Sequence, residues 1–112
     1  MSTITPALKD IPVACDLTAI PADKREAHET LARQLFFEAV PERQELSDGY
    51  AFRFGADQYP PLAAFIANER LCCPFLCFTL EVTPAQGPLW LRLTGGEGVK
   101  EFIQAEFPKE PQ

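Results

Sequence analysis

Prolines divide this sequence into short segments, and this punctuation limits the elements that the chain can form. Eleven of the 112 residues are proline. Proline cannot donate a backbone hydrogen bond, and it disfavours helical geometry in the residue before it. The prolines that separate blocks of apolar residues are Pro21, Pro41, Pro60, Pro61, Pro74, Pro84 and Pro88. Each block is long enough for one helix or one strand, and hydrophobic periodicity indicates which.

The part of the chain before Pro41 predicts one strand and then one helix. Apolar and polar residues alternate over Val13–Ile20, so that Cys15 and Leu17 share the apolar face of a strand. Pro21 ends that strand and opens a helix, since proline is favoured in a first helical turn. The expected inward stripe of the helix repeats every four residues: Ala27, Leu31, Leu35 and Ala39.

The rest of the chain predicts two hairpins, each followed or preceded by a helix. Asp48-Gly49 is a typical hairpin turn, and the period is two on both sides of Pro84–Pro88. The expected elements are strands at 42–46, 50–54, 76–82 and 89–93, a helix from Pro61 to Cys73, and a helix at 99–107. The order βαββαββα predicts an α+β fold, a mainly antiparallel sheet with helices packed on one face. We expect one domain at residues 13–107 and flexible tails at 1–12 and 108–112.

Composition and charge exclude several classes of protein. With 46% hydrophobic and 23% charged residues and no long uncharged run, the chain is neither disordered nor membrane-spanning. A net charge of −6 opposes binding to nucleic acid. The N-terminus has no basic region before an apolar stretch, which predicts a cytoplasmic protein rather than a secreted one. Thiols persist in that compartment, so the four cysteines are expected to bind metal or react rather than form disulfides.

The densest group of reactive side chains lies at residues 69–77, with the sequence ERLCCPFLC. Adjacent cysteines in a continuous helix point about 100° apart. Pro74 favours an extended Cys73, which lets the sulfurs of Cys72 and Cys73 converge where helix meets strand. A disulfide between them is disfavoured because neighbouring Cα atoms are only about 3.8 Å apart.

Helix periodicity also places Glu69 on the inward face of the second helix. A buried carboxylate needs a partner, unless the last helical turn frays and the side chain reaches water. The candidate partners are a backbone donor or one of three arginines, Arg25, Arg53 and Arg70.

Cys15 is the best candidate for a third sulfur ligand, because its strand could pass beneath the second helix with the thiol inward. Cys77 alternates with Leu76 and Phe78, so it is expected to face away from the core. His28 is the only histidine and lies near the charged side of the first helix. A closed zinc site with four Cys or His ligands is therefore poorly supported.

Three thiolates suit a soft ion such as Cu(I), Hg(II) or trivalent arsenic, and Zn(II) with an open position is also compatible. We expect Cys15, Cys72 and Cys73 to bind the metal, with Glu69 and Arg70 orienting the thiols or setting their pKa. Two other readings stay open. The chain could be a thiol redox protein that oxidises Cys72 or Cys73 reversibly, or a structural or small-ligand-binding module with cysteines in its core. The expected partner is a metal ion or small ligand, bound by a monomer or homodimer.

The motif Glu69-Arg70-x-Cys72-Cys73-Pro74-Phe75, with Leu89–Gly95 and Cys15–Thr18, resembles a family of small uncharacterised bacterial proteins. The resemblance covers roughly residues 13–107. It implies that the first cysteine and the adjacent pair recur, whereas the position of Cys77 usually holds another residue. Some members lie near genes for heavy-metal resistance or metal-responsive regulators. The resemblance implies no established activity, but it favours soft-metal binding.

Overall fold

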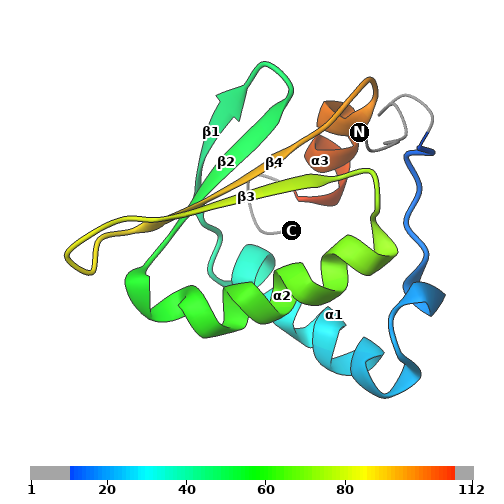
Figure 1. Ribbon diagram of the computed structural model, residues 1–112, viewed down its shortest axis with the longest axis horizontal. Helices are drawn as coiled ribbons and strands as arrows, with labels where there is room; N and C mark the ends of the chain where they lie inside the picture. The colour runs from blue at the N-terminus through cyan, green and yellow to red at the C-terminus, as the bar shows by residue number, and fades with distance from the viewer. Residues whose placement is uncertain (1–10, 108–112) are drawn as a thin grey trace, which may run out of the picture.

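A four-stranded antiparallel sheet with the strand order β1-β2-β4-β3 forms one layer of the structure (Figure 1). The computed structural model describes residues 11–107. Within that range the elements are α1 (Arg25–Arg33), β1 (Glu42–Leu46), β2 (Gly49–Phe54), α2 (Tyr59–Cys72), β3 (Cys77–Val82), β4 (Leu89–Thr94) and α3 (Val99–Glu106). The predicted α+β class and the antiparallel sheet are therefore confirmed.

The alternating residues of the two hairpins build the core. Tyr50 of β2 pairs with Leu93 of β4, and Phe52 pairs with Leu91, so these side chains share one face of the sheet. All four are buried, and the helices supply further buried residues to the same hydrophobic cluster. Arg53, on the opposite face of β2, is exposed. The helices thus cover the apolar face, and the opposite face carries Arg53 together with its partner Trp90 on β4.

The strand predicted at Val13–Ile20 does not form. Within this segment the chain makes a single 3-10 turn at Leu17–Ala19. The carboxylate of Asp16 accepts hydrogen bonds from the backbone N–H of Thr18, at 3.0 Å, and from its hydroxyl, at 2.5 Å. These local bonds bend the backbone and compete with extended pairing. Leu17, predicted to face inward, is 44% exposed.

The first helix turns a different face to the core from the one predicted. Its buried residues are His28 in α1 and Leu35 and Phe36 in a π-helical continuation at Gln34–Glu38. Ala27, expected inward, is exposed, and His28, expected near the charged side, is only 3% exposed. The predicted stripe is thus correct for Leu35, which is buried, and for Leu31, which packs against the core, and wrong for Ala27 and Ala39, which are exposed.

Ile11 packs against the hydrophobic core, although it falls in the first predicted tail. Pro12, the other described residue of that predicted tail, is exposed. The remaining residues of the two predicted tails, 1–10 and 108–112, lie outside the described part of the chain. None of the helices between residues 11 and 107 has the length and apolar character needed to cross a membrane.

Candidate metal centre

The last turn of α2 brings two adjacent sulfurs together. Cys72 is the final residue of the helix, and Cys73 leaves it with φ −124° and ψ 70° while its N–H still bonds to the carbonyl of Glu69. This is the departure from helical geometry that Pro74 was predicted to cause. The two sulfur atoms lie 3.3 Å apart, and both cysteines are 2% exposed. The predicted convergence of Cys72 and Cys73 is confirmed.

The N-terminal segment runs beside this end of α2 and contributes the third sulfur (Figure 1). The backbone N–H of Asp16 donates a 2.8 Å hydrogen bond to the carbonyl of Cys72, which ties the segment to the helix. Cys15 therefore lies next to the pair, with its Cα 4.6 Å from that of Cys73. The sulfurs of Cys15, Cys72 and Cys73 all lie within 4.8 Å of one another.

Cys15 and Cys73 are joined by a disulfide, whereas Cys72 is a free, buried thiol. The expectation that the clustered cysteines are all thiols is not met in this state of the protein. The bond links residues 58 positions apart rather than the adjacent pair. Neighbouring residues are poorly placed for a disulfide, while the approach of Cys15 to Cys73 falls within the usual Cα range.

A buried histidine completes the surroundings of the sulfurs. His28 Nε2 lies 2.8 Å from Glu69 Oε1, and both residues are buried. Glu69 is thus inward as predicted, but its partner is His28 rather than any of the three arginines considered. The imidazole also stacks on Phe65, with ring centroids 5.4 Å apart. Among the described residues, His28 Nδ1 has no hydrogen-bond partner.

The histidine could have been found from the sequence. His28, Leu31, Ala32, Leu35 and Phe36 follow the i, i+3, i+4, i+7, i+8 spacing of an inward helix face. That spacing includes more large apolar residues than the four-residue stripe beginning at Ala27. A histidine on this face points toward α2, with which α1 packs.

Glu69 also shapes the chemistry of Cys72. The Cys72 sulfur donates to Glu69 Oε1 at 3.6 Å, and Cys73 Sγ lies 3.7 Å from Glu69 Oε2. Burial, followed by the nearby Glu69 charge, raises the pKa of the Cys72 thiol to about 12. The thiol is therefore protonated at neutral pH, and an ion that binds Cys72 must displace this proton. Together, His28, Glu69 and Cys72 form a second group whose possible ligand atoms lie within 4.8 Å of one another.

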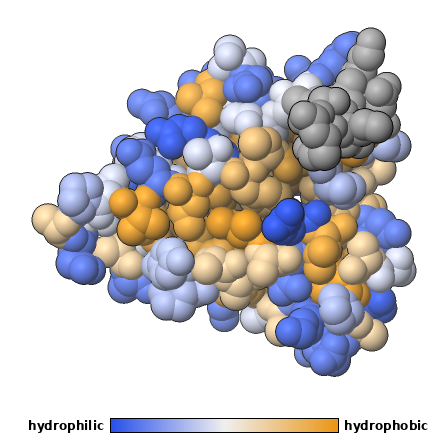
Figure 2. Space-filling view, in the orientation of Figure 1, coloured by the Kyte–Doolittle hydropathy of each residue, from blue (hydrophilic) through white to orange (hydrophobic). Residues whose placement is uncertain are grey.

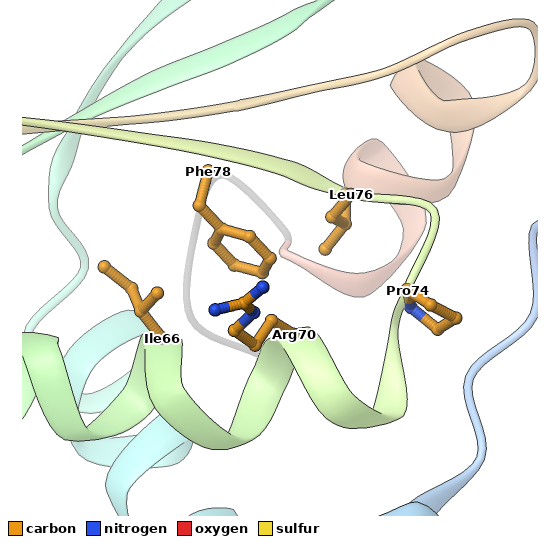
Figure 3. Close-up of a pocket in the computed structure, with 5 residues that line it drawn as sticks. All are labelled: Ile66, Arg70, Pro74, Leu76 and Phe78. Carbon is orange, nitrogen blue, oxygen red and sulfur yellow. The ribbon is translucent and has the colours of Figure 1, made fainter. Parts of the chain in front are cut away.

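Arg70 and Cys77 lie apart from this cluster. Arg70 lines a separate pocket of about 490 Å³ between α2 and β3, where its guanidinium extends toward Phe78 with Ile66 beside it (Figure 3). Hydrophobic side chains gather on the surface between these two elements (Figure 2). Cys77, at the start of β3, is a free and exposed thiol, as the strand alternation predicted. The structure brings Glu69, but not Arg70, to the three sulfurs.

The site must be interpreted from these contacts alone, because no family model, curated protein or solved structure matches the chain.

Proposed function

We propose that the reduced protein binds one soft metal or metalloid ion through the thiolates of Cys15, Cys72 and Cys73. The observation that carries this proposal is the mutual approach of the three sulfurs to within 4.8 Å. Two sulfurs bonded to one ion at about 2.3 Å can be separated by at most about 4.6 Å, so only a small adjustment is required. Sulfur ligands select soft ions, including Cu(I), Hg(II) and trivalent arsenic, and they also bind Zn(II).

Metal binding by all three residues requires reduction of the Cys15–Cys73 bond. A thiol reductant supplies two electrons and two protons, and the S–S bond is replaced by two S–H groups. The incoming ion then displaces the thiol protons as metal–sulfur bonds form. The disulfide form keeps only the Cys72 thiol in the cluster, so it lacks the trithiolate site.

Glu69 and His28 support the ligands in this proposal. Glu69 accepts the S–H of Cys72, which orients that sulfur, and His28 holds Glu69 through the 2.8 Å contact. This hydrogen bond is lost when the ion displaces the thiol proton, so Glu69 positions the Cys72 sulfur before binding and does not stabilise the bound thiolate. A borderline ion such as Zn(II) could also take nitrogen or oxygen donors from His28 and Glu69.

The test is a titration of the reduced protein with Hg(II), Cu(I), Zn(II) and As(III), with stoichiometry and sulfur-to-metal absorbance as readouts. We expect one ion per chain for at least one soft ion, and a loss of affinity in Cys15→Ser, Cys72→Ser and Cys73→Ser. Cys77→Ser is the matched control, because this thiol is exposed and outside the cluster, and it should bind as the wild type does. The proposal is wrong if the reduced wild type binds none of these ions tightly, or if only Cys77→Ser loses binding.

The disulfide itself favours a second candidate, a thiol redox protein in which Cys15 and Cys73 cycle between bonded and free forms. The high pKa of Cys72 makes that thiol a poor attacking nucleophile, so Cys15 and Cys73 would be the redox pair. Peroxide treatment of the reduced protein, followed by mass mapping, separates the two functions. Rapid and reversible Cys15–Cys73 bond formation, without metal binding in the titration, would favour the redox function.

A further inference from the structure

A pocket with apolar walls lies directly over the sulfur cluster. Cys15, Cys72 and Cys73 form part of its lining, and its volume is about 360 Å³. Its walls are side chains from the N-terminal segment, the first helix and the C-terminal helix: Leu17, Ala32, Phe37, Phe102 and Phe107. The sulfurs are therefore reached through a space bounded by aliphatic and aromatic groups.

The size of this pocket exceeds what a bare ion needs. Three sulfurs at about 2.3 Å enclose their ion without any adjoining cavity. Sites for small organic molecules begin at roughly 300 Å³, and an apolar cavity of about 150 Å³ is already large enough to bind benzene. A volume of about 360 Å³ beside the sulfurs thus has room for a ring-sized organic group.

The charges around the pocket restrict that organic group. Glu29 and Glu106 are exposed carboxylates that line the pocket, and the buried Glu69 lies at the sulfurs. No lysine or arginine of residues 11–107 is among the lining residues, and the lining imidazole of His28 already contacts Glu69. An anionic substituent would be repelled by the three carboxylates, whereas a neutral apolar substituent would not.

From this combination we propose that the preferred ligand is a trivalent organoarsenical carrying one neutral, apolar or aromatic substituent. The inference rests on the proposed thiol site and specifies its ligand class. The arsenic bonds to two of the three sulfurs, and the organic group occupies the space between Phe37 and Phe102. The aromatic walls stabilise that group by ring contacts and by removing it from water.

The binding step is a ligand exchange without electron transfer. A compound R–As(OH)₂ reacts with two thiols of the reduced protein, two As–O bonds break and two As–S bonds form. Each thiol proton leaves with a hydroxide as water, so two waters are released and arsenic stays trivalent. Inorganic arsenite, As(OH)₃, forms up to three As–S bonds in the same way but has no group to fill the pocket.

The experiment compares the affinities of reduced protein for phenylarsine oxide and for arsenite. We expect the wild type to prefer phenylarsine oxide. Phe37→Ala and Phe102→Ala should each reduce this preference roughly 3- to 10-fold, the range of a lost aromatic contact, with little change for arsenite. Phe78→Ala is the matched control, because Phe78 lines the separate Arg70 pocket, and it should keep the wild-type preference.

A phenylarsine oxide with a para-carboxylate provides a second measurement that needs no variant. It should bind more weakly than the parent compound, and the deficit should shrink as salt is added. The ligand class would be overturned if phenylarsine oxide and its para-carboxylate bound equally well, or if both Phe variants kept the wild-type preference for phenylarsine oxide over arsenite. Tight arsenite binding would in that case still support the thiol site. Failure of the reduced wild type to bind either arsenical, Hg(II), Cu(I) or Zn(II) would instead overturn the proposed function itself.

Discussion

The three clustered sulfurs have different surroundings. Cys72 is buried against Glu69 and stays protonated, Cys73 is buried at the helix end, and Cys15 is on an exposed segment. An incoming ligand would therefore meet Cys15 at the surface before it reaches the two buried sulfurs. This difference in exposure suits the proposed site, which would capture an ion or arsenical from solution and then remove it from water.

At the residue scale, the buried His28–Glu69 contact is testable by stability. Replacing His28 with Phe keeps the ring contact with Phe65 but removes the imidazole that contacts Glu69. The remaining contacts of this carboxylate within residues 11–107 are with cysteine sulfurs. We expect the free energy of unfolding to fall by about 2 kcal/mol, because the carboxylate loses its strongest hydrogen bond. Urea denaturation measures this change.

The double variant His28→Phe/Glu69→Leu is the control for that experiment. It removes both polar groups together, so it should recover much of the lost stability. Equal midpoints for wild type and His28→Phe would mean that the contact contributes nothing to stability.

At the element scale, one hydrogen bond connects the N-terminal segment to the end of α2. The donor is the backbone N–H of Asp16 and the acceptor is the carbonyl of Cys72. Asp16→Pro deletes this donor, while Asp16→Ala keeps it and serves as the control. We expect the Cys15–Cys73 bond to be reduced more readily in Asp16→Pro, by roughly 3- to 10-fold in the equilibrium constant, the value of one lost hydrogen bond.

Equilibration with mixtures of reduced and oxidised dithiothreitol, followed by mass spectrometry, measures that constant. Both variants lose the side-chain bonds of Asp16 to Thr18, so the difference between them reports the backbone at residue 16, where proline removes the N–H and also moves φ away from −134°. Indistinguishable constants would show that the disulfide forms without help from this contact.

Elements that pair or pack according to their own periodicity were predictable from the sequence. Strands β1 to β4 and helices α2 and α3 lie close to their predicted ranges. In these segments the hydrophobic period and the turn residues that bound it are compatible with only one type of element. Val13–Ile20 has the same alternation but no strand, since Asp16 bonds locally to Thr18. Alternation reports which faces differ in polarity, and it does not report whether a neighbouring strand is available.

The candidate site was predictable in part for the same reason. The Pro74 constraint is local, so the convergence of Cys72 and Cys73 followed from sequence. Cys15 was expected there on an inward strand, yet it arrives on an irregular segment fastened by a backbone hydrogen bond. The contact between His28 and Glu69 depends on how α1 packs against α2, and the predicted inward stripe of the first helix did not include His28.

At the scale of the whole molecule, the disulfide and the proposed ion are alternative cross-links between the same segments. The bond joins residues 58 positions apart, and closing a loop of that length restricts the unfolded chain by about 4 kcal/mol. We expect thermal unfolding of the reduced protein to occur at a lower temperature than that of the oxidised protein. As(III) should restore much of the difference, because ligand binding to the native state stabilises it.

Differential scanning calorimetry of the oxidised, reduced and arsenite-loaded forms measures these shifts. The Cys72→Ser variant is informative here, because it keeps the disulfide but lacks one proposed ligand. Its reduced form should recover less stability with As(III) than the wild type does. Stabilisation by As(III) that does not depend on any cluster cysteine would contradict the cross-link.

The segment that carries Cys15 belongs to no strand, and its residues from Pro12 to Ala19 are exposed. Detaching such a segment breaks few contacts, so it opens far more often than the sheet unfolds. The lifetime of a bound ion would then be governed by this local opening, with the Cys15 bond released first and the buried pair last. The proposed site would then bind an ion tightly at equilibrium and still release it quickly to a competing thiol.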